Sequence, residues 1–183
     1  MKREGFPVPL RAVVIGSSCS GKTTLAKHLA ESFHVPHVEL DRLYWGANWT
    51  PVEALLFRTQ VRQHVEEENW IVDGNYSVIQ DEVFQRANLI LWLNLPLRVV
   101  FGRALFRSFV RILSREEIFA GNRETFLRTF GPCSLLWWIL TSFRERNRRY
   151  RAIFDKRDRT QTQLIELCST SEVEHFVREI HKD

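Results

Sequence analysis

A glycine-rich stretch at residues 16–24 restricts the fold of this chain more than any other feature. It reads Gly-Ser-Ser-Cys-Ser-Gly-Lys-Thr-Thr and fits G-x-x-x-x-G-K-[ST], the pattern of a phosphate-binding loop. An apolar run at 10–15 precedes it, as a buried strand would, and a segment with helical spacing follows at 24–31. A glycine loop cradles phosphate only between a strand and a helix, so the pattern predicts an α/β fold.

The residues of this loop supply donors that converge on a triphosphate. Gly16 and Gly21 let successive N–H groups turn inward, and the helix that follows adds the positive end of its dipole. We expect Lys22 to contact the β- and γ-phosphates, Thr23 to bind Mg²⁺ and Thr24 to lie near the α-phosphate. The predicted nucleotide site consists of Gly16, Ser17, Ser18, Cys19, Ser20, Gly21, Lys22, Thr23 and Thr24.

Composition favours one globular domain over residues 1–183. Of the 183 residues 44% are hydrophobic and 26% charged, and no apolar run approaches the roughly 20 residues of a membrane span. The first residues lack a signal-peptide pattern, and the three cysteines are too far apart to form a metal cluster. Cys19 is interpreted as a small filler of the loop. We expect a cytoplasmic protein without a membrane partner.

Positive charge is concentrated in two stretches, although the net charge is only +4. Residues 98–115 hold five arginines and no acid, and residues 144–159 hold eight cations against three acids. Such runs bind phosphates on small ligands or on nucleic acid. A solvated helix face explains the second run equally well.

Strand and helix patterns alternate along the chain. Strands are expected at 35–41, 70–74, 89–94 and 163–167, and helices at 51–67 (capped by Thr50), 97–113, 134–157 and after Ser171. This alternation predicts a parallel sheet covered by helices, with the wholly apolar 89–94 near its centre.

Polar residues end three of these strands, where parallel sheets gather their ligands. We expect Asp73 to hold Mg²⁺ through water and to orient the acceptor, and Asp41 to contact metal water or an acceptor hydroxyl. A turn-forming role is the alternative for both. Asn94 stands where many P-loop proteins have Asp, and an amide offers no full charge to a metal.

Arginines after the fourth strand fit the needs of phosphoryl transfer, whose moving group is negatively charged. Arg103 and Arg107 are four residues apart on one helical face, and a solvated face is the alternative for them. Arg123 falls in an expected lid, approximately residues 103–130, which would exclude water. The predicted catalytic residues are Lys22, Asp73, Arg103, Arg107 and Arg123.

Six segments together resemble one family. They are residues 16–24, Leu40-Asp41-Arg42-Leu43-Tyr44-Trp45 with Trp49, residues 70–77, Arg86-Ala87-Asn88, Leu93-Asn94-Leu95-Pro96 and Gly121-Asn122-Arg123-Glu124. The chain resembles the adenylate-kinase-related P-loop proteins known as DNA topology modulation proteins. The resemblance implies a three-layer fold with a five-stranded parallel sheet in the order 2-3-1-4-5, a helical lid, and the use of ATP and Mg²⁺.

The chain departs from adenylate kinases at the acceptor side. Those enzymes carry Asp-Gly-Phe-Pro-Arg where this chain has Asp-Gly-Asn-Tyr-Ser at 73–77, so the arginine that grips the monophosphate is missing. We expect the acceptor to contact Asp41, Trp45, Asp73 and Tyr76. Trp45 and Tyr76 either stack a base or merely pack.

Three functions follow from these patterns. The favoured one is an ATP-dependent phosphotransferase acting on a nucleotide or another small molecule. A nucleotide-dependent, DNA-associated regulator is the alternative, supported by the arginine-rich 144–159 stretch. A plain NTPase switch ranks last, because no water-positioning Gln or Glu can be assigned. The acceptor, the choice between ATP and GTP and the oligomeric state stay open.

Overall fold

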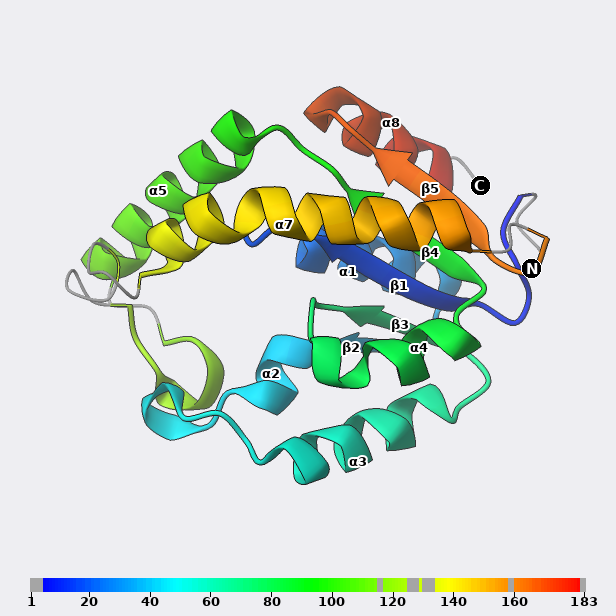
Figure 1. Cartoon of the computed structure of the whole chain (residues 1–183), viewed down its shortest axis with the longest axis horizontal. Coiled ribbons are helices and arrows are strands. Elements are labelled where there is room, and N and C mark those ends of the chain that lie inside the picture. Colours follow the sequence, from blue (N-terminus) through cyan, green and yellow to red (C-terminus); the bar gives the residue numbers. More distant parts are fainter. Residues whose placement is uncertain (1–4, 115–116, 125–128, 130–133, 158–159, 182–183) are drawn as a thin grey trace.

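The computed structural model describes residues 5–114, 117–124, 129, 134–157 and 160–181, and shows three layers with a sheet in the middle (Figure 1). Five parallel strands lie in the order β2-β3-β1-β4-β5. They are β1 (Arg11–Gly16), β2 (His37–Glu39), β3 (Trp70–Asp73), β4 (Leu89–Leu93) and β5 (Gln163–Leu167). The predicted fold class and strand order are confirmed.

Seven helices and three short 3-10 turns connect the strands within the described residues. The helices are α1 (Lys22–Phe33), α2 (Leu40–Tyr44), α3 (Ala54–Val65), α4 (Gln80–Arg86), α5 (Leu97–Ser114), α7 (Leu135–Lys156) and α8 (Thr170–His181). The turns are η1 (Ala47–Trp49), η2 (Ser77–Ile79) and η3 (Phe119–Gly121). None of the described helices is long and apolar enough to cross a membrane.

Alternation along the buried strands divides the core between the two faces of the sheet. Val13 and Ile15 of β1 face one cluster, which α3, α4 and α7 cover with residues such as Phe57 and Phe154. The intervening residues of β1 face the second cluster, under α1 and α8. Because β1 and β4 are buried on both faces, the carboxyl end of β1 is held rigidly where the phosphate-binding loop begins.

The helices α5 and α7 continue beyond the sheet and pack on each other (Figure 1). Their contact is apolar and contains Val100, Ala104, Leu136 and Ile139. Residues 117–124, hereafter the lid segment, belong to the connection between these helices. Residues 115–116, 125–128 and 130 of the expected lid lie outside the described residues.

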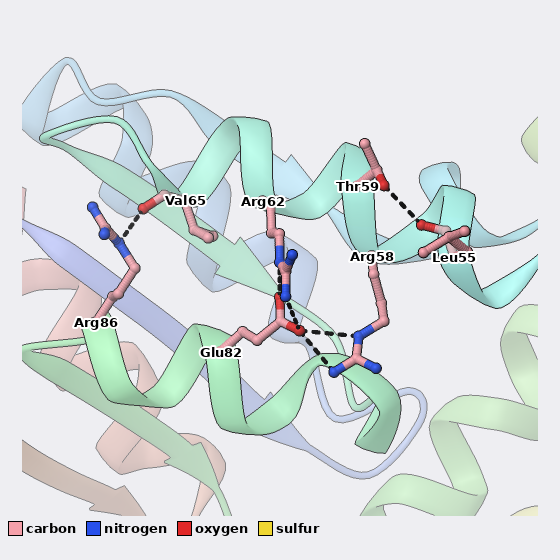
Figure 2. A network of polar contacts seen from close by, with 7 residues as sticks. All are labelled: Leu55, Arg58, Thr59, Arg62, Val65, Glu82 and Arg86. Atoms are coloured by element: carbon pink, nitrogen blue, oxygen red, sulfur yellow. Dashed lines mark hydrogen bonds and ion pairs between the residues drawn. The ribbon is translucent and has the colours of Figure 1, made fainter.

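Figure 2 shows how ion pairs join α3 to α4. Glu82 of α4 accepts hydrogen bonds from Arg58 and Arg62 of α3, with N···O distances of 2.8 and 2.7 Å. The hydrogen bond from Arg62, helped by Arg58, lowers the pKa of Glu82. Arg86 donates to the carbonyl of Val65 at 2.6 Å. These contacts fix α3, which carries Phe57 beneath the aromatic side chains described below.

The helix expected from residue 51 begins later, and Thr50 does not cap it. α3 starts at Ala54, with Glu53 as its N-cap residue. The reason is local pairing, because Pro51 forms an antiparallel bridge with Trp45 and so extends the preceding loop. The cap expected at Ser171 is also displaced, since Ser169 accepts the hydrogen bond from the Glu172 N–H at 3.1 Å.

We predict that Gly74 cannot be replaced without loss of stability. Its φ is +144°, and an added Cβ would lie 2.8 Å from Leu40 side-chain atoms. Gly74→Ala should lower the free energy of unfolding by about 1–3 kcal/mol in urea denaturation. Gly102→Ala is the matched control, because nothing lies within 4 Å of its added Cβ. It should stabilise α5 by about 0.5–1 kcal/mol, and equal effects of the two substitutions would contradict the account.

Candidate functional site

A cleft of about 2290 Å³ opens beside the loop at the carboxyl end of β1. The phosphate-binding loop, α2, η1, the lid segment, α5 and α7 all contribute side chains to it. A pocket for one small ligand typically measures about 300–1000 Å³, so the cleft has room for a nucleotide and a second ligand.

The loop at 16–21 has the backbone of an anion cradle. Gly16 has φ +151°, and an added Cβ would lie 2.7 Å from the carbonyl oxygen of Leu93. The next turn is closed by a hydrogen bond from the Ser20 N–H to the Ser17 carbonyl at 3.2 Å. The hydroxyl oxygens of Ser17 and Ser20 are buried and have no hydrogen-bond partner. These groups fit a bound phosphate chain.

Lys22 lies at the base of this loop. Its Nζ donates to the carbonyl oxygen of Ser17 at 3.0 Å. Burial lowers the pKa of Lys22, whereas the carboxylates of Asp41 and Asp73 act to raise it. Lys22 thus hydrogen-bonds the loop in which an anion would lie.

A buried carboxylate connects the loop to the neighbouring strand. Asp73, at the end of β3, is 3% exposed and accepts a hydrogen bond from the Thr23 hydroxyl at 2.6 Å. His37 Nε2 lies 2.9 Å from the other Asp73 oxygen, and a carboxylate accepts, so this nitrogen carries the proton. Because the Thr23 proton points at Asp73, the hydroxyl lone pairs are available to a cation.

Two residues of this region were missed by the sequence interpretation. His37 lies on β2, and its approach to Asp73 depends on the pairing of β2 with β3. The Asn75 Oδ1 accepts a hydrogen bond from the Gly16 N–H at 3.3 Å, and its Nδ2 donates to the Gly16 carbonyl at 2.5 Å. No spacing rule signals either contact, because each joins residues far apart in sequence: His37 of β2 with Asp73 of β3, and Asn75 after β3 with Gly16 of β1.

Aromatic side chains and a carboxylate line another part of the cleft. The Tyr76 hydroxyl donates to Asp41 at 2.5 Å, and burial raises the pKa of Tyr76. The ring centroids of Tyr44 and Tyr76 are 4.4 Å apart, and those of Trp45 and Trp49 are 5.8 Å apart. Asp41 lies on α2 rather than at a strand end, since β2 stops at Glu39.

The structure brings three of the four expected acceptor residues to the cleft. Asp41, Trp45 and Tyr76 line it, and both aromatic residues also pack against neighbouring rings. Asp73 is buried behind Thr23 instead. Its position suits a metal-bound water better than direct contact with an acceptor.

Arg103 and Arg107 of α5 both reach the cleft beside the loop. Arg103 donates to the Ser20 carbonyl at 3.0 Å and to the Thr170 hydroxyl at 3.2 Å. Arg107 Nε is buried without a hydrogen-bond partner. Burial raises the pKa of the neighbouring Cys19 thiol, and the charge of Arg107 opposes that effect. The elevated pKa agrees with a filler role for Cys19.

Arg123 is placed differently from the expectation. It pairs with Glu117 at 2.5 Å, is about half exposed (52%) and does not line the cleft. Arg146 of α7, which sequence spacing did not single out, does line it. Its guanidinium donates to the Ser142 hydroxyl at 2.6 Å, and its Nη1 is buried without a hydrogen-bond partner. Burial lowers the pKa of Arg146, and its charge also lowers that of Lys22.

Asn94 has a structural contact network of its own. Its amide donates to Glu166 at 2.8 Å and accepts from Asn147 at 3.0 Å, which ties β4 to β5 and α7. Glu166 also accepts two hydrogen bonds from Arg151, each at 2.7 Å. The amide therefore holds the sheet and α7 together, and the carboxylate beside Thr23 comes from Asp73.

The donor set fits Mg²⁺ bound together with a nucleotide. Among the described residues, no three His, Cys, Asp or Glu side chains gather as a metal cluster. Mg²⁺ prefers oxygen ligands and keeps several waters, using few protein ligands beside substrate phosphates. The Thr23 hydroxyl would ligate the ion, and Asp73 would hold one of its waters.

Comparisons with known proteins bear on the fold of the chain. No protein-family model matches the chain. The chain is 25% identical to a cytidylate kinase from Methanosphaerula palustris over 131 residues, 63% of this chain and 72% of that protein. A gluconokinase structure from Sinorhizobium meliloti aligns with TM-score 0.54 and 18% identity over 94% of this chain and 89% of that one. A shikimate kinase structure from Bacteroides thetaiotaomicron aligns with TM-score 0.54 and 20% identity, covering 94% and 97%.

The structural likeness shows that the chain has the three-layer fold of P-loop kinases. The finer resemblance to DNA topology modulation proteins is not shown and stays a prediction. The sequence likeness to cytidylate kinase is distant and adds a nucleotide kinase to the proteins that this chain resembles.

We predict that His37 orients Asp73 and thereby sets metal affinity. His37→Leu removes the N–H at 2.9 Å from Asp73, whereas His37→Gln can keep an N–H donor there. Loss of such an outer contact typically weakens metal binding about 10–100-fold. Titration of Mn²⁺ into the ATP-bound protein, followed by electron paramagnetic resonance, should show this loss for Leu and not for Gln. Equal affinity in all three proteins would rule out the role.

Proposed function

We propose that this protein is a kinase that transfers the γ-phosphoryl group of ATP to a nucleotide or another small molecule. Lys22, Thr23 and three arginines converge on one cleft, and Asp41 and aromatic side chains line another part of it. This convergence is the observation that carries the proposal. Among the arginines that line the cleft, these three are Arg103, which hydrogen-bonds the loop, and Arg107 and Arg146, which each have a buried nitrogen without a hydrogen-bond partner. The fold of P-loop kinases and the distant cytidylate kinase relative support it.

The chain's residues would position ATP and stabilise negative charge as it shifts during transfer. Backbone N–H groups of the loop and Lys22 would bind the phosphates, with Thr23 and Asp73 holding Mg²⁺. The ion, when bound, neutralises charge on the β- and γ-phosphate oxygens. Arg107 and Arg146 each present a buried nitrogen without a hydrogen-bond partner, and a phosphoryl group would satisfy both.

The acceptor would lie between Asp41 and the aromatic wall. Asp41 and Lys22 line the same cleft, and the charge of Asp41 acts to raise the pKa of Lys22, so an acceptor bound to Asp41 would share the cleft with the γ-phosphate. The Tyr76 hydroxyl occupies one oxygen of Asp41 and leaves the other to accept an acceptor O–H. Positioning and charge carry most of this reaction, so no dedicated base is required.

No contact among the described residues favours the DNA-associated alternative. Several arginines of the basic 144–159 run are engaged within the molecule. Arg146 lines the cleft, Arg149 donates to Gln80, and Arg151 pairs with Glu166. Residues 158–159 of that run lie outside the described residues. We therefore retain the kinase, with a cytoplasmic location as the setting in which ATP and the free thiols of Cys19 and Cys168 fit.

Acceptor-dependent ADP release tests the proposal. Mg-ATP is offered with a panel of nucleoside monophosphates, nucleosides and hydroxy acids, beside a reaction without acceptor. We expect one chemical class to raise ADP release, and Lys22→Met to abolish it. Lys156→Met is the control, because Lys156 lies at the end of α7 and does not line the cleft. ADP release indifferent to every acceptor would contradict kinase activity.

Arg146 should act mainly on the transfer step. Arg146→Ala is expected to lower kcat about 10²-fold or more, as loss of a charge-stabilising donor does, with the Kd for Mg-ATP changed only a few-fold. Arg148→Ala is the comparison, since Arg148 is exposed on the same helix. Equal kcat values for the two variants would remove Arg146 from the proposed site.

A further inference from the structure

A buried amide joins two segments that lie far apart in the sequence. Residues 45–51 are hereafter the acceptor loop, and Figure 1 shows it (cyan) beside the lid segment (yellow-green). Asn122 of the lid segment is only 4% exposed. Its Oδ1 accepts from the Trp49 N–H at 2.8 Å, and its Nδ2 donates to the Gly46 carbonyl at 2.8 Å.

The side chain of Asn122 uses both of its N–H donors. The second donates to the Phe119 carbonyl at 2.6 Å, within the lid segment itself. The Trp49 indole adds a weaker contact to the Arg123 carbonyl at 3.4 Å. A carboxamide offers one acceptor and two donors, and Asp in its place would lose both donations. The junction therefore requires a carboxamide side chain.

Each of the two segments is closed by its own contacts, so Asn122 serves to connect them. Trp45 pairs with Pro51 in the acceptor loop, and Glu117 pairs with Arg123 in the lid segment. Left-handed backbone conformations occur on both sides of the junction, with φ 58° at Trp49 and 53° at Ala120. Such conformations are costly in non-glycine residues and persist where surrounding contacts hold them.

The junction contributes side chains to the cleft. Trp45 and Trp49 on one segment and Phe119 on the other all line the cleft. We propose that Asn122 is a positioning residue that joins the lid segment to the acceptor loop, so that the acceptor wall is complete only while this amide bridges them. This inference rests on the proposed kinase function.

The ATP side of the cleft does not depend on the amide. Lys22, Thr23 and Asp73 are held by the loop, β3 and β2 through contacts that include no lid residue. Breaking the Asn122 bridge should therefore loosen the acceptor site and leave nucleotide binding intact. Exchange of acceptor and product would require this bridge to open.

Hydrogen exchange at the Trp49 amide tests the bridge without an acceptor. In the wild-type protein this amide should exchange much more slowly than in an unstructured peptide, and exchange at the peptide rate would overturn the proposal without any variant. Asn122→Ala should speed its exchange about ten-fold or more, the usual effect of losing such a hydrogen bond. Arg123→Ala is the matched control for exchange, because it removes the Glu117 ion pair and leaves the Asn122 contacts.

A kinetic comparison then separates this proposal from the kinase proposal. With the acceptor found by ADP release, Asn122→Ala should raise its KM about ten-fold, with the Kd for Mg-ATP unchanged. Unchanged Trp49 exchange, or faster exchange with unchanged acceptor KM, overturns the positioning role and leaves the kinase proposal standing. Wild-type protein with no acceptor-dependent ADP release overturns the kinase proposal, and with it the acceptor role of the bridge.

Discussion

The hydrogen bonds on Asp73 are the interaction on which the rest of the site depends. The Asp73 carboxylate accepts hydrogen bonds from the hydroxyl of Thr23, which follows the phosphate-binding loop, and from the imidazole of His37 on the neighbouring strand. Because Asp73 is buried, its orientation is fixed by these two donors rather than by water. These hydrogen bonds align the loop with β3. Asn75, two residues after Asp73, adds hydrogen bonds to the N–H and the carbonyl of Gly16.

This rigid nucleotide side faces an acceptor side assembled from separate segments. Asp41 and Tyr76 come from α2 and from the exit of β3, and the outer wall comes from the acceptor loop and the lid segment. The ion pairs of Glu82 hold α3 against α4 beneath that wall. Such a division suits a two-ligand reaction, in which one partner binds to a preformed loop and the other is enclosed by parts that can separate.

Local patterns predicted the fold class and the loop because each strand, each helix and the loop motif is specified by residues near in sequence. The strand-loop-helix order around Lys22 and the all-apolar β4 were readable from periodicity alone, whereas the strand order came from the family resemblance. The rest of the site depends on register and on loop pairing. His37 meets Asp73 across two strands, and Asn122 meets Trp49 across more than seventy residues. Arg123 and Arg146 show the same limit, since composition located the basic runs without showing which arginines would face the cleft.

Transfer of a labelled γ-phosphoryl group tests the central claim most directly. ATP labelled with ¹⁸O in its γ-phosphate is incubated with the protein, Mg²⁺ and an extract of small metabolites, and products are separated by mass spectrometry. The account predicts a labelled phosphate ester or anhydride of a small molecule with the wild-type protein and none with Lys22→Met. Label found only in inorganic phosphate, or retained entirely in ATP, would contradict it.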